Sequence, residues 1–144
     1  MAEQKTLDSF LETIRQQMSV VEDLIKVESD IANAASSDDT AKLEVIVKGS
    51  EPVVMNFRGL ERKRLQLTKE LGYEGKTFSQ ILAVLDTENK ARFSPVFEEL
   101  STAMTRLKDV EASAERIMTV RLNDVNDSIR TMSAPPKPLQ DTRV

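Results

Sequence analysis

The chain has 144 residues, of which 31% are charged and only 4% are aromatic, and its formal net charge is −4. This length predicts one domain with a modest core, and the aliphatic, helix-forming composition is typical of helical bundles and coiled coils. The negative charge disfavours free nucleic acid as a ligand, and the absence of His and Cys disfavours catalysis and zinc binding, so we expect no enzyme, metal or cofactor.

A first long amphipathic helix is predicted near the N-terminus. Its apolar residues recur three and four positions apart, at Leu7, Leu11, Ile14, Met18, Val21 and Ile25. Thr6 is a suitable N-cap. We expect a turn at residues 36–39, where small and short polar residues compete with the helix for backbone hydrogen bonds.

A second helical stripe covers residues 43–71. Gly49, Ser50 and Pro52 lie together in its first half, and a proline removes an amide donor and clashes with the preceding turn. We therefore expect a kink there, or a restart with Ser50 as N-cap. The helix should end immediately before Gly72, because glycine can adopt the left-handed conformation that satisfies the last carbonyl groups.

A short helix and a third long helix are predicted next. Thr77 and Gln80 match a capping box, which predicts a short helix that reaches Leu85. The following apolar stripe covers residues 97–132 at helical spacing. Pro95 is tolerated if it lies in the first turn of this last helix.

These elements predict an all-α fold, an elongated antiparallel helical bundle or coiled coil of three long helices and one short helix. Residues 1–132 form a single domain in this prediction, and the proline-rich residues 133–144 are expected to form a flexible, disordered tail. The start of the chain lacks the apolar core of a signal peptide, and no apolar run has transmembrane length. We therefore expect a cytoplasmic protein that does not insert into membranes.

Pairs of carboxylates are the remaining candidates for catalysis. Asp8 with Glu12, and Glu98 with Glu99, lie away from the apolar stripes, where nothing would shield them from water. We interpret both pairs as parts of solvated helix faces. The four glycines form neither a phosphate-binding loop nor a dinucleotide fingerprint, so a nucleotide site is not expected.

Positive charge is densest in the second predicted helix. Arg58, Arg62 and Lys63 belong to this patch, which is either a solvated face or a docking site for an acidic partner. Arg64 and Glu111 both interrupt apolar stripes. They either pair across the bundle and fix its register or lie at an open end of it, and we favour the pairing.

The end of the last stripe is a candidate surface for binding a partner. Its members are Met118, Leu122, Val125, Ile129 and Met132. Methionine adapts to irregular partner surfaces, and this helix is expected to outlast its neighbours. The stripe is therefore either bundle core or an exposed groove that accepts an amphipathic helix of another protein.

A family resemblance rests on short motifs at three places in the chain. These are the acidic pair Asp38 and Asp39 before the second helix, the run Arg64, Leu65, Leu67, Leu71 and Gly72 that closes it, and Leu122-Asn123-Asp124-Val125-Asn126. Together with the short Thr-capped helix and the long final helix, they resemble the FlgN family of flagellar type III export chaperones. The resemblance covers roughly residues 7–132.

The resemblance implies a cytoplasmic chaperone that holds the hook-associated proteins of the hook–filament junction and delivers them to the export gate. The alternative is a structural coiled-coil adaptor, which would use the same rod for permanent assembly, for example as a homo-oligomer. A chaperone should be soluble alone and should release its client. An adaptor should be obligately oligomeric.

Overall fold

The computed structural model describes residues 2–37, 39–113 and 125–132 of the chain. Four helices follow one another: α1 (Ala2–Ser36), α2 (Thr40–Glu70), α3 (Phe78–Val84) and α4 (Thr87–Ser113). Residues 125–132 are also helical, and we call them the C-terminal segment. The all-α prediction is confirmed for the part of the chain that the structure describes.

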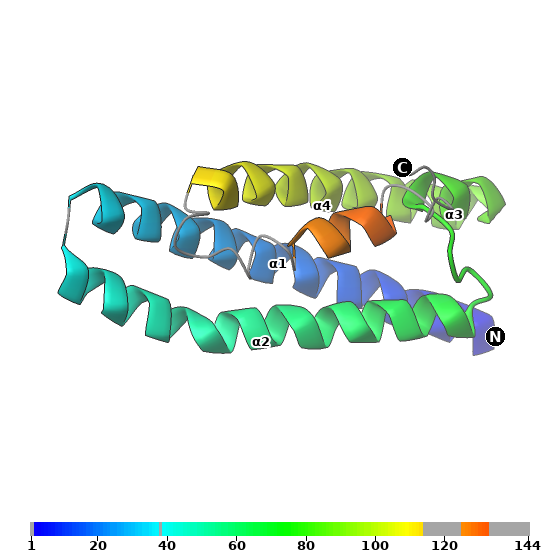
Figure 1. Cartoon of the computed structure of the whole chain (residues 1–144). Coiled ribbons are helices and arrows are strands. Elements are labelled where there is room, and N and C mark those ends of the chain that lie inside the picture. Colours follow the sequence, from blue (N-terminus) through cyan, green and yellow to red (C-terminus); the bar gives the residue numbers. More distant parts are fainter. Residues whose placement is uncertain (1, 38, 114–124, 133–144) are drawn as a thin grey trace, which may run out of the picture.

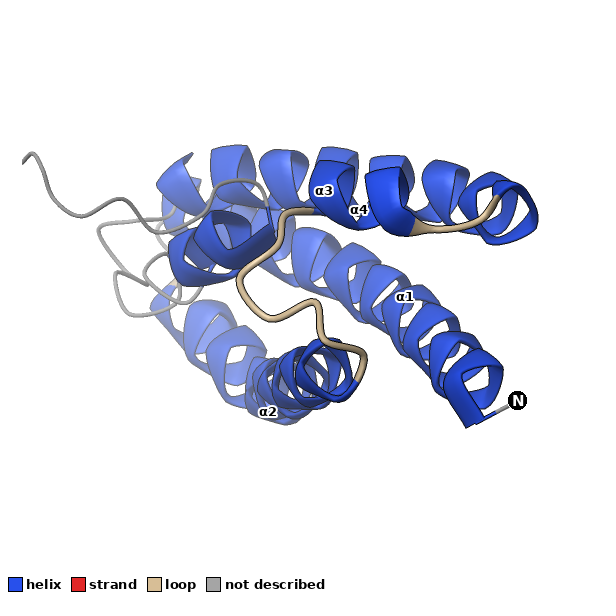
Figure 2. Ribbon diagram, turned by 90° about the vertical axis from the view of Figure 1, so that its right-hand side faces the viewer, coloured by secondary structure: helices blue, strands red, loops and turns tan. Residues whose placement is uncertain are grey.

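The helices form an elongated bundle around α1. α1 packs against both α2 and α4, whereas α2 and α4 make little direct contact with each other. Figures 1 and 2 both place the C-terminal segment between α2 and α4. At about 1.5 Å per residue, a helix as long as α1 spans roughly 50 Å, so the bundle is a rod.

The first helix is longer than the sequence pattern suggested. α1 begins at Ala2, so the prediction of Thr6 as N-cap is wrong. Residues 2–5 are good helix formers, and Gln4 donates a hydrogen bond to Asp8 one turn later (3.0 Å). The predicted turn is confirmed, because the amides of Ser37 and Asp39 bond back to carbonyl groups of the last turn of α1.

The second helix passes through Pro52 without a restart. α2 covers residues 40–70, and its N-cap is Asp39, whose carboxylate accepts from the Lys42 amide (3.0 Å). Ser50 is buried inside the helix and donates to the Val47 carbonyl oxygen (2.6 Å), so the prediction of Ser50 as a cap is wrong. The ribbon bends in this half of α2 (Figure 1). Because Pro52 faces solvent, the missing amide bond leaves no buried group unsatisfied.

The end of α2 and the start of α3 agree with the sequence. Leu71 caps α2, Gly72 has a φ of +79°, and the amide of Tyr73 bonds back to the Thr68 carbonyl oxygen (2.7 Å). At α3 the capping box is complete. The Thr77 hydroxyl accepts from the Gln80 amide (3.2 Å), and the Gln80 side chain accepts from the Thr77 amide (2.9 Å).

The fourth helix starts earlier than expected. α4 begins at Thr87, after Asp86, whose carboxylate accepts from the Asn89 amide (2.8 Å) as an N-cap does. Pro95 therefore lies inside α4 and not in its first turn. Its ring faces solvent, where water can satisfy the carbonyl group that loses its helical partner.

The single helix predicted over residues 97–132 is also wrong. Phe78 stacks on Phe97 with ring centroids 4.0 Å apart, Arg64 lies over the Phe78 ring, and Arg64 also bonds Thr131. Thr131 therefore lies at the level of Phe97. In one straight helix these two residues would be about 50 Å apart. The C-terminal segment thus lies back alongside α4 and does not extend it (Figure 1).

The core runs along the contacts of α1 with α2 and α4 and includes side chains of α3. Phe10, Phe78, Phe93 and Phe97 form an aromatic cluster there, with ring centroids 4.0 to 6.1 Å apart. Among the described residues, no helix is both long and apolar enough to span a bilayer. The predicted flexible tail, residues 133–144, lies outside the described residues.

Candidate functional site

The C-terminal segment covers one face of the bundle with two fully buried side chains. Val125 is 2% exposed and Met132 1% exposed, and both belong to the main core cluster. Ile129 is half-buried and packs against the same cluster. Their spacing of four and three is that of helix positions that share one face. The segment is therefore amphipathic, with its apolar face on the bundle.

A polar contact joins the segment to α2. Arg64 is 2% exposed, and its guanidinium donates to both carboxylate oxygens of Glu61 (3.1 and 2.7 Å) and to the Thr131 hydroxyl (3.0 Å). The Thr131 hydroxyl lies 3.2 Å from Glu61 Oε2 and 2.9 Å from the Ser128 carbonyl oxygen. A buried arginine must find partners for its donors, so these bonds fix the segment along α2.

The same network reaches two further helices. Gln17 of α1 is fully buried and donates to Glu61 Oε1 (2.8 Å). The Arg64 guanidinium carbon lies 5.7 Å from the centre of the Phe78 ring on α3, within the range of a cation–π contact. Glu61 and Arg64 therefore connect α1, α2, α3 and the C-terminal segment at one level of the rod.

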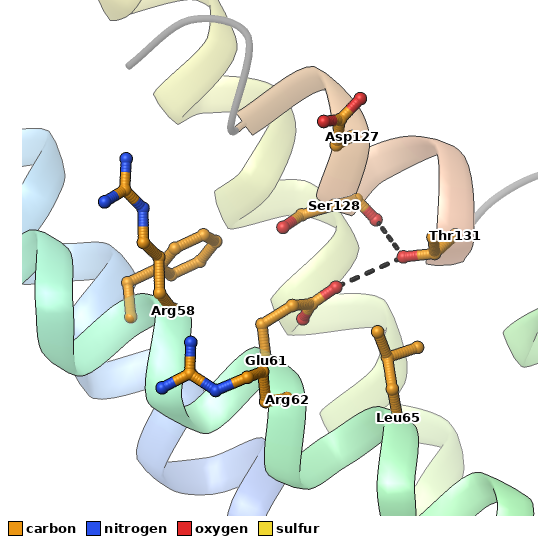
Figure 3. Close-up of a pocket in the computed structure, with 8 residues that line it drawn as sticks. Arg58, Glu61, Arg62, Leu65, Asp127, Ser128 and Thr131 are labelled. Carbon is orange, nitrogen blue, oxygen red and sulfur yellow. Dashed lines mark hydrogen bonds between the residues drawn. The ribbon is translucent and has the colours of Figure 1, made fainter. Parts of the chain in front are cut away.

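A hollow of about 250 Å³ lies between α2 and the segment (Figure 3). Five residues of α2 and three of the segment line it: Phe57, Arg58, Glu61, Arg62, Leu65, Asp127, Ser128 and Thr131. The hollow is large enough for a side chain but not for a helix.

We call the surface under the segment the seat and define it by four residues of α2: Phe57, Glu61, Arg64 and Leu65. Phe57 is 3% exposed and Leu65 40% exposed, so the seat grades from core to rim. Two buried apolar side chains hold the segment, whereas α1 buries apolar side chains along its whole length. Because the segment is short and contributes only two buried apolar side chains, we expect it to open at a lower free-energy cost than α1.

The structure places the predicted stripe only in part. Val125 and Met132 are buried in the closed bundle and Ile129 is half-buried, so these three do not line an open groove here. Met118 and Leu122 lie outside the described residues. Whether a partner touches this stripe stays a prediction.

The predicted basic patch lies beside the same site. Arg58, Arg62 and Lys63 are all exposed on α2, and Arg58 and Arg62 line the hollow (Figure 3). The patch and the stripe, separate in the sequence, are therefore neighbours. Figure 3 shows Asp127 of the segment on the opposite side of the hollow from α2.

The predicted pairing of Arg64 with Glu111 is wrong. Arg64 pairs with Glu61, one turn earlier on the same helix. Arg64 lies at the level of Phe97, and Glu111 is about 21 Å further along α4. Both residues are nevertheless buried, as their positions in the stripes suggested.

Sequence reasoning missed Gln17, Glu61, Ser128 and Thr131. Glu61 was detectable, because an acidic residue three positions before an arginine on a helix is a suitable pairing partner. Gln17, Ser128 and Thr131 are polar residues of ordinary helix-surface type. The roles of Ser128 and Thr131 follow from the fold of the C-terminal segment onto α2, and that of Gln17 follows from the packing of α1 on α2. The periodicity encodes neither arrangement.

The carboxylates considered for catalysis are solvent-exposed. Asp8, Glu12, Glu98 and Glu99 all lie on the surface, as the sequence indicated. Hydrogen bonds from Gln4 and Arg92 lower the pKa of Asp8, and Arg92 also forms an ion pair with it (3.0 Å). Within the described ranges no cluster of three or more His, Cys, Asp or Glu residues could hold a metal ion.

Comparison with known proteins connects the chain to a family. The model of the FlgN protein family matches residues 1–142, nearly the whole chain. The chain belongs to the FlgN family. FlgN proteins are flagellar export chaperones and not enzymes, so the resemblance noted in the sequence is confirmed at the level of the family. A search of curated proteins and a search of solved structures found no match.

Proposed function

We propose that this FlgN-family chain is a cytoplasmic chaperone that binds hook-associated proteins and keeps them competent for type III export. The family match over residues 1–142 carries the proposal. The helical rod supports it, because a rod offers long side surfaces to helical segments of a client. The two buried anchors of the C-terminal segment support it too, because a weakly held apolar helix is suited to exchange.

We further propose that residues 118–132 govern client capture. This region contains the partner-binding stripe that the sequence predicts, which consists of Met118, Leu122, Val125, Ile129 and Met132. Because Val125 and Met132 are buried in the closed bundle, client capture in this region requires the C-terminal segment to leave its seat. Client binding and opening of the segment are then coupled equilibria.

The basic patch is the proposed docking site for an acidic partner, such as an acidic face of the export gate. Arg58, Arg62 and Lys63 are exposed along one stretch of α2. Exposed charges act mainly on the rate and the salt dependence of association. Docking through this patch should therefore weaken as the salt concentration rises.

The proposal is tested with the purified full chain and each purified hook-associated protein of the same bacterium. Size-exclusion chromatography and isothermal titration should show a soluble, reversible complex, with a Kd on the order of micromolar, since ordering a client segment opposes the burial of its apolar face. The adaptor alternative predicts instead an obligate oligomer that takes up no hook-associated protein. That pair of results would refute the chaperone assignment.

A further inference from the structure

The seat and the C-terminal segment together have the geometry of a helix bound in a groove. Val125, Ile129 and Met132 occupy positions i, i+4 and i+7, the spacing by which amphipathic helices anchor in apolar grooves. The groove side is supplied by the core cluster that α1, α2 and α4 share, while α2 also contacts Ser128 and Thr131 of the segment. The segment is thus bound to the bundle as an amphipathic ligand would be.

α2 and α4 make little direct contact with each other, so the segment is what lies between them. If the segment left, Phe57 and the core side chains that Val125 and Met132 cover would become exposed to water. Arg64 would lose its bond to Thr131 at the same time. The newly exposed apolar surface favours occupation of the seat by another helix.

We infer that the seat is the place where a client's amphipathic helix binds, and that residues 125–132 occupy it as an internal competitor. This inference rests on the proposed chaperone function. It differs from direct contact with the stripe, because here the apolar residues of the segment oppose client binding by closing the seat. The apolar residues of the segment then occupy the binding site of the client and do not themselves bind the client.

The seat specifies the chemistry of the helix that it takes. Three apolar side chains should repeat as Val125, Ile129 and Met132 do. A hydrogen-bonding side chain should occupy the place of Thr131, because the side chains of Arg64 and Glu61 both form hydrogen bonds at that position. At the rim, Arg58 and Arg62 favour an acidic side chain near the place of Asp127.

The decisive measurement is the sign of the change in client affinity when the segment is weakened. An internal competitor that occupies the seat in most molecules lowers the apparent affinity for the client. The affinity falls in proportion to the fraction of molecules in which the seat is open. The full-length double variant Val125→Ala/Met132→Ala should therefore bind hook-associated proteins on the order of tenfold more tightly than the parent. Direct contact with the stripe predicts weaker binding by the same variant.

Two milder variants keep the test valid if the double variant unfolds. Ile129→Ala removes a half-buried side chain, and Thr131→Val removes the bond to Arg64 without removing bulk. Each should tighten client binding by about fivefold, the effect of losing roughly one such contact from the closed form. Thr105→Val is the matched control for Thr131→Val, because Thr105 is an exposed α4 threonine that bonds only within its own helix among the contacts seen (3.1 Å).

Circular dichroism and thermal melting confirm that each variant is folded before titration. Tighter binding by the segment variants and unchanged binding by Thr105→Val support the inference. Weaker or unchanged binding by the segment variants overturns it and leaves the chaperone function intact. If parent and variants alike bind no hook-associated protein, the proposed function itself fails.

Discussion

Arg64 of α2 and Thr131 of the C-terminal segment are 67 residues apart in the sequence and 3.0 Å apart in space. Arg64 is buried to 2% exposure, so the contact lies inside the bundle and not on its surface. Glu61 neutralises the arginine from the same helix, and Thr131 accepts one of the remaining donors. A single side chain therefore links the charge balance of α2 to the position of the segment.

Replacing Arg64 by Met should destabilise the protein by about 3 kcal/mol, because it leaves the carboxylate of Glu61 partly buried without its cation. Urea unfolding followed by circular dichroism measures the loss. The double variant Arg64→Met/Glu61→Gln should recover part of it, since the unpaired charge is then gone. Arg62→Met, at an exposed position on the same helix, is the control and should change stability little.

If Arg64→Met lowered the unfolding free energy no more than Arg62→Met does, the network would contribute nothing to stability. The recovery in the double variant separates two causes of a large loss. Lost packing of the arginine stem persists in the double variant, whereas an unpaired carboxylate does not.

The elements that the sequence predicted best are those with a local chemical signal. Gly72 ends α2 because its φ of +79° suits a residue without a β-carbon, and Thr77 with Gln80 starts α3 through two short-range hydrogen bonds. Such signals need only neighbouring residues. The all-α class was equally accessible, because helical periodicity persists over every long segment.

The errors have a common physical cause. A stripe of apolar residues shows which face of a helix is buried but not whether consecutive turns belong to one helix. Residues 97–113 and 125–132 carry one periodic stripe, yet they lie antiparallel (Figure 1). The start of α4 was missed for a related reason, because Pro95 is tolerated on its exposed face and was read as an N-terminal signal. The Arg64–Glu111 pairing failed because interruptions of two apolar stripes do not show at which level of the rod each residue lies, and Glu111 is about 21 Å further along α4.

The contribution of the α3 capping box to the unfolding free energy should be measurable with a single substitution. Thr77→Ala removes the side-chain acceptor for the Gln80 amide and should cost about 1 kcal/mol of unfolding free energy. Ser79→Ala, an exposed position inside the same helix, is the control and should have a smaller effect. Chemical denaturation of the two variants under identical conditions gives the comparison. Equal losses would mean that the cap does not stabilise the native state.

The contact of Asp8 with α4 should make stability depend on pH in the acidic range. Hydrogen bonds from Gln4 and Arg92 lower the pKa of Asp8 from its ordinary value of 3.8. A carboxyl group whose pKa is lower in the folded state stabilises that state above its unfolded pKa, and the contribution is lost as the pH falls through the folded pKa. The melting temperature of the parent should therefore exceed that of Asp8→Asn near neutral pH, with the difference shrinking below about pH 4.

Arg92→Gln tests the same contact from the other side. Combined with Asp8→Asn, it should lower the melting temperature at neutral pH by less than the two single effects together, because both remove one ion pair. Additive effects, or a difference that persists unchanged in acid, would show that Asp8 acts through something other than its charge.

Two truncations separate the segment from the residues beyond it. Removing residues 133–144 should leave the melting temperature nearly unchanged, because a proline-rich sequence buries little apolar surface. Removing residues 125–144 also deletes Val125 and Met132 from the core. It should lower the unfolding free energy by about 1–3 kcal/mol, since the lost burial is partly offset by the chain entropy that the segment no longer gives up. A larger loss, with a collapse of helicity, would mean that the bundle cannot form without the segment, and a client could then not displace it. A small loss together with tighter client binding would show that the seat exists independently of the helix that fills it.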